Sequence, residues 1–434
     1  MSVDKTNRQM NIASIILAGG KGTRLYPLTL SHSKPAIRYG GKYRLIDIPI
    51  SNSLNSNIRQ IYVIGQYLTA ELQHHIAQTY QFDYFSPGSI DFLTPGEYPD
   101  GQKVWFEGTA DAIRKNLHTI LKSPVDYFLI LSGDQLYNIN FRKMLEFTIE
   151  KDADLTIATI PVKEAESKRL GLLKTDEEFL INDFYEKPQE SHILSRFRIP
   201  PSFYKKMGKP FPSEHHYLAS MGIYIFKRET LKNLLEEDLR EDFGKHLIPT
   251  QITKGKTASF LYEGYWEDIG TVESFYHANL SLIDEPNRGL QVYDEENPIF
   301  GNMLCLPGPK IFNANIAHSI ISEGSIINAK EISRCIIGPR TSIKQGTTMR
   351  NSIVMGNNFY ISPSDHTHSL PHHFEIGENC LIEKTIIDEH VFIGNGVTLT
   401  NKKKLAHYDS EKLYVRDGII VITAGASIPD GFSF

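Results

Sequence analysis

The stretch Leu17-Ala18-Gly19-Gly20-Lys21-Gly22-Thr23-Arg24-Leu25 follows the short apolar run 14–17, which predicts a buried strand. Three glycines within four positions allow a sharp turn and a close approach of the backbone to a ligand. Successive backbone N–H groups in such a turn suit an anion, and Lys21 and Arg24 add positive charge. These residues favour a nucleotide triphosphate site, but taken alone they are equally typical of an ordinary turn between a strand and a helix.

Composition indicates an ordinary globular protein of more than one domain. The chain has 434 residues, 41% hydrophobic and 22% charged, so two domains are expected. Its net charge of −5 gives no reason to expect a nucleic acid or a membrane as partner, and no stretch is long and apolar enough to cross a bilayer. The three cysteines are widely spaced, which argues against a disulfide framework, and residues 1–11 lack a signal-peptide core. We therefore expect a cytoplasmic protein.

Residues 11–285 alternate β-like and helix-like runs, which predicts an α/β domain with a Rossmann-like, mostly parallel sheet. Strands are expected at 14–18, 60–65, 127–131, 155–162, 221–226 and 259–262, and helices at 69–79, 109–121, 141–150 and 229–237. Ligands of such sheets bind beyond the carboxyl ends of the strands. The glycine turn after Leu17 and the turn Ser132-Gly133-Asp134 are both expected there.

Residues 311–434 have a different texture: an aliphatic residue recurs at every sixth position in several runs with slips in the spacing between them, about nine hexads in all. The column is formed by Ile321, Ile327, Ile337, Ile343, Met349, Ile376, Ile382, Ile387, Ile393 and Leu399. This period predicts a parallel β-helix of hexapeptide repeats, whose stacked coils bury the column. Residues 286–310 are rich in Pro, Gly and Asn and are expected to be a linker. The histidine-rich segment 362–373 interrupts the repeats, and we assign it no role.

Two carboxylates and two lysines are candidates for the chemistry. Asp134 ends an apolar strand, and Asp268 lies in Gly264-Tyr-Trp-Glu-Asp-Ile-Gly-Thr271; together they offer the ligands that Mg²⁺ prefers beside substrate phosphates. Either Asp alone is more often a helix cap or a turn residue. Lys34 and Lys187 each precede a proline, which favours extended backbone and a defined projection. A solvent-facing role for each lysine remains open.

The motifs together resemble the glucose-1-phosphate adenylyltransferases, also called ADP-glucose pyrophosphorylases, over nearly the whole chain. The matching segments are 17–25, Leu28-Thr29, Lys34-Pro-Ala36, Tyr43-Arg-Leu-Ile-Asp-Ile-Pro49, Ser51-Asn52, Asn55-Ser56, Gly108-Thr-Ala-Asp-Ala112, Ser132-Gly-Asp134, Glu186-Lys-Pro188, Ala219-Ser-Met-Gly-Ile-Tyr224 and Glu267-Asp-Ile-Gly-Thr271. Residues 266–282 and the C-terminal repeats are most similar to the plant and cyanobacterial branch. The resemblance implies a nucleotidyltransferase domain followed by a left-handed β-helix for regulation and oligomerisation.

The resemblance also implies the reaction and its residues. ATP and α-D-glucose 1-phosphate would give ADP-glucose and diphosphate for glycogen or starch synthesis, in a Mg²⁺-dependent in-line displacement by a homotetramer. Arg24 and Lys34 would contact the phosphates, and Asp134 and Asp268 would hold Mg²⁺. The implied substrate contacts are Gly19, Gly20 and Gly22 at the nucleotide, Gln66 at the adenine edge, Lys187 at the sugar phosphate, and Glu186, Ser220 and Gly171 at the glucose. Trp105 matches a position that couples regulation to the site.

The regulatory resemblance is incomplete. Lys402 matches one lysine that binds phosphorylated activators in the plant-like branch, but the other activator lysines fall on Ser31 and Ala424. Because a phosphate loses a charge-assisted partner at each of these two positions, we expect activation by sugar phosphates or 3-phosphoglycerate to be weak or altered.

Three other functions are consistent with parts of the sequence. A nucleotidyltransferase that uses UTP, dTTP or GTP would carry the same motifs, since spacing does not reveal base preference. A catalytically silent regulatory subunit would share the fold, although the candidate catalytic residues are retained. An acyltransferase β-helix would need a general base, for which His318 and His390 are the candidates.

Overall fold

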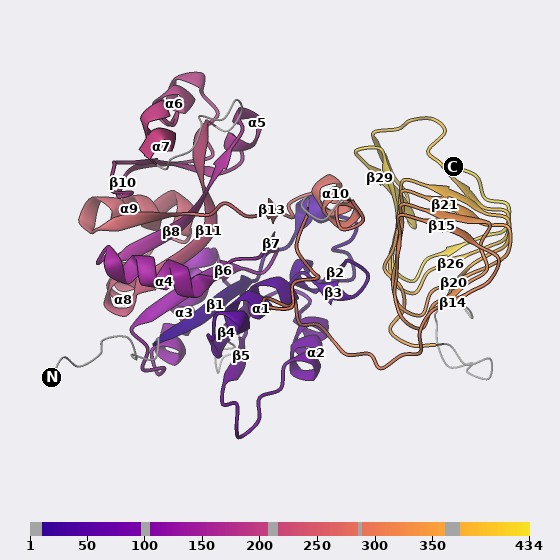
Figure 1. Ribbon diagram of the computed structural model, residues 1–434, viewed down its shortest axis with the longest axis horizontal. Helices are drawn as coiled ribbons and strands as arrows, with labels where there is room; N and C mark the ends of the chain where they lie inside the picture. Colours follow the sequence, from indigo (N-terminus) through magenta and orange to yellow (C-terminus); the bar gives the residue numbers. More distant parts are fainter. Residues whose placement is uncertain (1–10, 97–104, 207–215, 285–288, 361–373) are drawn as a thin grey trace.

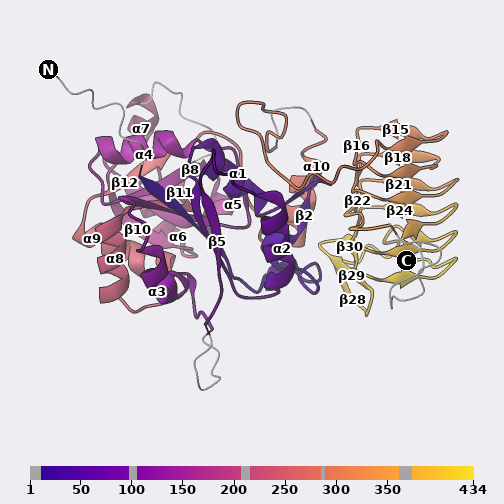
Figure 2. The same ribbon diagram turned by 90° about the horizontal axis from the view of Figure 1, so that it is seen from below.

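The computed structural model describes residues 11–96, 105–206, 216–284, 289–360 and 374–434. An α/β domain and a β-helix lie side by side, with the β-helix coils stacked at one end of the molecule (Figure 1, Figure 2). The histidine-rich segment 362–373 and the predicted domain boundary at 285–286 lie outside the described residues. None of the helices in the described ranges is long and apolar enough to cross a bilayer.

The α/β domain is built on one nine-stranded sheet of order β10-β9-β11-β6-β1-β4-β5, in which β8 also pairs with β11 and β12 pairs with β8. The strands are β1 (Ile12–Ala18), β4 (Gln60–Gly65), β5 (Ser89–Leu93), β6 (Tyr127–Ser132), β8 (Leu155–Val162), β9 (Gly171–Thr175), β10 (Ile181–Glu186), β11 (Tyr217–Lys227) and β12 (Thr257–Leu261). The half β6-β1-β4-β5 is parallel, as predicted. Strand β11 is antiparallel to β6, β8 and β9, so the sheet changes direction beside the strand that carries Asp134.

Helices cover both faces of this sheet. The helices are α1 (Asp47–Asn55), α2 (Thr69–Thr79), α3 (Thr109–Ile120), α4 (Phe141–Glu150), α5 (Glu164–Ser167), α6 (Ser191–Arg196), α7 (Pro201–Lys206), α8 (Arg228–Glu237), α9 (Ile248–Lys254) and α10 (Val272–Leu280). Apolar residues of α1, α2, α4 and α10 join one buried cluster, and those of α3, α8 and α9 join the other. Because both faces are covered, Ala13, Ile15 and Ile16 of β1 are all fully buried.

The C-terminal domain is a parallel β-helix of three sheets, whose coils appear as parallel rungs in Figure 2. The first sheet contains β14 (Lys310–Ile311), β17 (Ile326–Ile327), β20 (Ser342–Ile343), β23 (Glu375–Ile376), β26 (Phe392–Ile393) and β31 (Ser427–Ile428). The second contains β15 (Asn315–Ala317), β18 (Glu331–Ser333), β21 (Thr348–Arg350), β24 (Leu381–Glu383) and β27 (Thr398–Leu399). The third contains β16 (Ile320–Ile321), β19 (Ile336–Ile337), β22 (Ile353–Val354), β25 (Thr385–Ile387), β30 (Ile419–Ile422), β29 (Leu413–Arg416) and β28 (His407–Asp409). Every predicted column residue is buried except Ile321, which is partly buried against the same cluster. The hexad pattern therefore predicted this core correctly.

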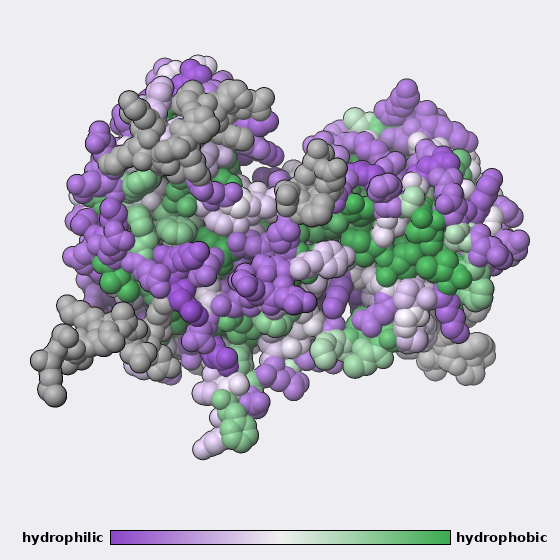
Figure 3. Space-filling view, in the orientation of Figure 1, coloured by the Kyte–Doolittle hydropathy of each residue, from purple (hydrophilic) through white to green (hydrophobic). Residues whose placement is uncertain are grey.

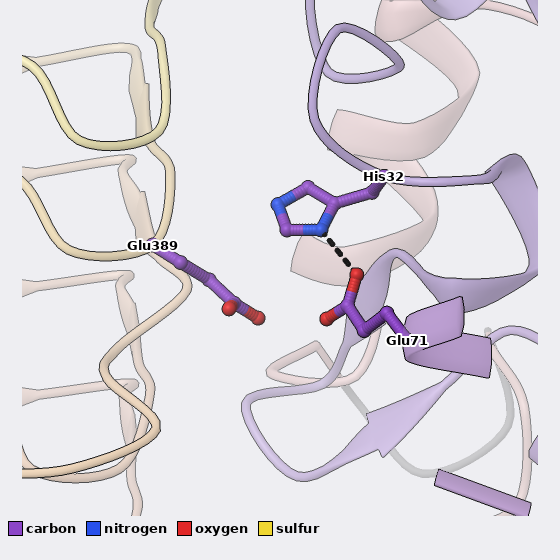
Figure 4. Close-up of side chains that lie close together, drawn as sticks. All are labelled: His32, Glu71 and Glu389. Carbon is purple, nitrogen blue, oxygen red and sulfur yellow. Dashed lines mark hydrogen bonds and ion pairs between the residues drawn. The ribbon is translucent and has the colours of Figure 1, made fainter. Parts of the chain in front are cut away.

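The two domains meet along a seam that is both apolar and charged. Residues of the β-helix, including Ile336 and Ile386, belong to the same buried cluster as α1, α2 and α10. Six charged side chains form what we call the seam cluster: His32, Arg38, Arg44 and Glu71 of the α/β domain, and Asp388 and Glu389 of the β-helix. Figure 4 shows Glu389 reaching from a β-helix coil toward His32 and Glu71.

The ion pairs of the seam cluster shift the ionisation of its members. Burial alone would lower the pKa of His32, but Asp388 and Glu71 outweigh it and raise the pKa to about 11. Burial alone would raise the pKa of Glu389, but Arg38, His32 and Arg44 lower it to about 2. His32 therefore carries a positive charge, and Glu389 a negative charge, across the neutral range.

This shift predicts a pH dependence of stability. Folded His32 holds its proton from its ordinary pKa of 6.5 up to about 11, so its stabilisation is complete below 6.5 and declines as pH rises toward 11. The decline is at most about 1.4 kcal/mol per pH unit. We expect the difference in unfolding free energy between wild type and His32→Gln, measured by urea denaturation, to shrink from about pH 7 to about pH 9. The exposed His192→Gln serves as control; a constant difference for His32→Gln would contradict the assignment.

Candidate active site

A cavity of about 530 Å³ opens at the carboxyl ends of β1 and β6, where ligands of such sheets bind. Gly19, Gly20 and Lys21 line it from the turn after β1. Gly22 has φ +63°, and a Cβ there would lie 2.8 Å from Thr29 Cγ2, so the turn at this position requires glycine. The structure thus places the predicted glycine turn at the wall of a cavity, with Gly22 shaping the turn behind it.

Lys34 and Asp134 form an ion pair on the floor of this cavity. The Lys34 ammonium donates to Asp134 Oδ2, and the Ser132 hydroxyl donates to Asp134 Oδ1. Lys34 is buried, in the short helix η3 (Lys34–Ala36), and both it and Asp134 line the cavity. Lys34 and Asp134 are 100 positions apart in the sequence, and together they place one positive and one negative charge side by side in the cavity lining.

Asp268 lies next to Asp134 because β13 (Trp266–Asp268) pairs antiparallel with β7 (Gln135–Tyr137), which places Asp268 opposite Gln135. Burial raises the pKa of Asp268, and the negative charge of Asp134 raises it further. Two partly buried carboxylates that repel each other are relieved by a shared divalent cation. The donor set therefore fits Mg²⁺, and Asp134 and Asp268 are the residues that would hold it.

Arg24 lies outside the main cavity. It lines a second cavity of about 290 Å³ together with Arg169, Asp268 and Gly270. The Arg24 guanidinium carbon would be 3.4 Å from a Cβ added at Gly270, so glycine at this position leaves room for it. The structure thus places Arg24 on the Asp268 side of the site, separate from Lys34, and its contact with phosphate stays a prediction.

The opposite end of the main cavity is lined by Glu186, which ends β10. Glu186 Oε1 forms an ion pair with Lys187 Nζ at 2.8 Å. Gly171 lies directly beside it, because a Cβ there would be 2.7 Å from Glu186 Oε2. Ser220 is buried, and its hydroxyl accepts from the Gly222 amide at 3.2 Å. The structure brings these four residues, which were predicted to contact glucose 1-phosphate, to one region; Lys187 is half exposed, and Ser220 is buried and is not part of the cavity lining.

Gln66 closes the other rim of the cavity by binding a neighbouring loop. Its side-chain oxygen accepts from the Phe106 amide at 3.1 Å, and its side-chain nitrogen donates to the Phe106 carbonyl at 3.3 Å. Tyr67 stacks on Trp105 with ring centroids 5.2 Å apart, and Lys21 Nζ lies 5.4 Å from the Tyr67 ring. Gln66 and Trp105 therefore lie in two neighbouring segments that contact each other at the edge of the cavity, beside Lys21 of the glycine turn.

Several lining residues were not predicted. Gln135 lines the cavity, and its side-chain oxygen is buried without a hydrogen-bond partner, which leaves it available to a ligand. Tyr224 and the segment Asp242-Phe243-Gly244 line the Glu186 end. Gln135 could have been found from its place directly after Asp134, whereas Asp242–Gly244 lies in a polar stretch with no periodic signal.

The predicted regulatory and alternative residues lie elsewhere. Lys402 is exposed and donates to Ser433 Oγ at 3.1 Å within the β-helix. Ser31 is exposed and Ala424 is half-buried. His318 is exposed, and His390 stacks against Phe359 with centroids 5.1 Å apart while its Nε2 accepts from the Asn358 amide. Neither histidine lines a cavity with the catalytic candidates among the described residues.

Comparison with protein families agrees with both domains. The family model described as nucleotidyl transferase matches residues 13–285. The model described as the GLGC left-handed parallel β-helix domain matches residues 304–432, which establishes the handedness of the coils. The chain therefore belongs to the nucleotidyl transferase family, and its pairing of that domain with this left-handed β-helix is the architecture of the glucose-1-phosphate adenylyltransferases.

Proposed function

We propose that the protein transfers the adenylyl group of ATP to α-D-glucose 1-phosphate, giving ADP-glucose and diphosphate for glycogen or starch synthesis. The observation that carries this proposal is one continuous cavity lined by the glycine turn and the Lys34–Asp134 pair, with Glu186 at its far end. Such a cavity can hold a nucleotide and a sugar phosphate with their phosphates between them. Membership of the nucleotidyl transferase family supports the reaction class, and the β-helix supports glucose 1-phosphate as acceptor.

The reaction needs positioning and charge neutralisation more than covalent chemistry. An oxygen of the sugar phosphate forms a bond to the α-phosphorus of ATP, the bond from that phosphorus to the bridging oxygen breaks, and diphosphate leaves. Mg²⁺ held by Asp134 and Asp268 would neutralise phosphate charge. Lys34 is paired with Asp134 in the lining of the cavity, where its ammonium would face the phosphates. Arg24, which lines the second cavity with Asp268, would hold the diphosphate as it leaves.

The first prediction from the proposed function concerns Asp134. Asp134→Asn removes the partner of Lys34 and one carboxylate of the proposed cation site. We expect the turnover number to fall by at least about 100-fold with little change in the melting temperature. The matched control is Asp152→Asn, since Asp152 is an exposed aspartate that pairs only with Lys227 among the described contacts. Full activity of Asp134→Asn would remove Asp134 from the mechanism.

The second prediction concerns the nucleotide. Diphosphate release from glucose 1-phosphate, measured separately with ATP, UTP, dTTP and GTP, is expected to be fastest with ATP. Equal or faster release with another triphosphate would reject the assignment to ADP-glucose, and no release with any of the four would favour a catalytically silent subunit.

The third prediction concerns regulation. Because Ser31 and Ala424 stand where cationic anchors would be expected, each missing contact costs a bound phosphate about 1.5–3 kcal/mol. We expect 3-phosphoglycerate to change the substrate concentrations for half-maximal velocity only slightly. A many-fold decrease in those concentrations on adding millimolar 3-phosphoglycerate would contradict this prediction.

A further inference from the structure

The segment from His32 to Arg38 connects the active-site lysine to the β-helix. His32 Nε2 lies 3.4 Å from Asp388 Oδ1, and Arg38 Nε donates to Glu389 Oε1 at 2.5 Å. Lys34 lies between these two attachment points, two residues after the first and four before the second. The two carboxylates are adjacent in sequence, directly after β25, so one turn of the β-helix holds both ends of the segment.

The seam cluster is buried and balanced in charge. Arg38 is 7% exposed and Glu389 is 2% exposed. With His32 protonated, the cluster holds three cations and three anions. Carboxylate and imidazole atoms of His32, Glu71 and Glu389 lie within 4.8 Å of one another, a spacing that could suit a metal ion (Figure 4). Because Arg38 and Arg44 already bind those carboxylates, the cluster is an ion-pair network rather than a cation site.

The backbone of the segment leaves little freedom between the seam and Lys34. The Ile46 amide donates to the Pro35 carbonyl at 2.9 Å, and the Leu45 amide donates to the Ile37 carbonyl at 3.1 Å. Pro35 itself lines the active-site cavity next to Lys34. A shift of the segment at the seam would therefore move the Lys34 ammonium relative to Asp134.

Removing Glu389 would leave the buried Arg38 without its carboxylate partner, and removing Asp388 would leave His32 with Glu71 as its remaining anion. A buried cation that loses an anionic partner is costly unless the cation moves. The cations concerned, His32 and Arg38, are part of the segment that carries Lys34. We propose that Asp388 and Glu389 of the β-helix are positioning residues for Lys34, which hold the catalytic lysine in its productive place through the ion pairs of the seam. This inference rests on the proposed nucleotidyl transfer, in which Lys34 faces the phosphates.

The test uses the full chain and two independent readouts. Steady-state turnover is measured for wild type, Glu389→Gln and Asp388→Asn. In parallel, the rate of Lys34 acetylation by acetic anhydride is followed by peptide mass spectrometry, which needs no activity. Asp284→Asn is the matched control, because the Asp284–Arg334 pair at 3.2 Å also involves the β-helix but does not touch the segment.

We expect Glu389→Gln to lower the turnover number by about 10- to 100-fold, as small misplacements of catalytic groups do, and to raise the rate of Lys34 acetylation several-fold. Asp284→Asn should leave both unchanged. Glu389→Ala opens space beside Arg38, so added acetate should restore turnover in this variant, whereas Glu389→Gln, whose amide fills the space, should not respond. Rescue of turnover by acetate without a rise in the melting temperature would not follow from a purely structural role.

Unchanged turnover and unchanged Lys34 labelling in Glu389→Gln would overturn the proposal, as would an equal loss in Asp284→Asn. If Glu389→Gln fails to fold, Asn358→Ala is measured in its place, because the exposed Asn358 forms hydrogen bonds with both Arg38 and Glu389. The proposal then requires Asn358→Ala to lower the turnover number, by less than is expected for Glu389→Gln. An inactive wild type would refute the proposed function, and the labelling experiment would still decide whether the β-helix positions Lys34.

Discussion

The ion pair between Lys34 and Asp134 is the interaction on which the site depends. It joins the segment that follows the glycine turn to the end of β6, and so brings the nucleotide loop and the carboxylate side of the site together. Asp268 arrives beside this pair through the pairing of β13 with β7. Each of these groups alone would be costly to keep partly buried. The positive charge of Lys34 offsets part of the negative charge of the two carboxylates, and a divalent cation with phosphate would complete the balance.

The β-helix gives the α/β domain a rigid neighbour. Its coils repeat one short unit with a filled aliphatic column, so its turns hold fixed positions relative to one another. Two of its features reach the segment that carries Arg24 and Lys34. Asp388 and Glu389 hold His32 and Arg38, and the Tyr414 ring packs edge-on against Tyr26 at 5.3 Å, with a hydrogen bond between their hydroxyls at 3.1 Å. The architecture therefore links the β-helix to both cations of the site.

Much of the fold was predictable because its signals are local. Buried parallel strands are continuous apolar runs, and β4, β8, α2 and α4 have the predicted bounds. The β-helix column was predictable because its six-residue period recurs in several runs along the chain. The predicted strand at 221–226 is the C-terminal part of the longer β11, whose antiparallel direction depends on tertiary pairing. Strands β9 and β10 were missed because they are partly exposed and carry polar residues.

The site was predictable from motifs and family resemblance, but its contacts were not. The sequence placed Asp134 and Lys34 as separate candidates, and only the structure shows that they bind each other. Two further features are contacts between residues that are far apart in the sequence: the hydrogen bonds between Gln66 and Phe106, and the seam cluster. A third, the unpartnered side-chain oxygen of Gln135, depends on burial. No spacing rule encodes such contacts, since they arise only when distant segments fold together and, for the seam cluster, when the two domains pack against each other.

The most direct test of the central claim is to follow the fate of each phosphate of ATP. The protein is incubated with glucose 1-phosphate and ATP labelled either at the α-phosphate or at the γ-phosphate, and the products are separated. Nucleotidyl transfer at this site predicts that the α label appears in the sugar nucleotide and that the γ label leaves in diphosphate. Appearance of the γ label in a sugar phosphate, with the α label in ADP, would show phosphoryl transfer and contradict the account.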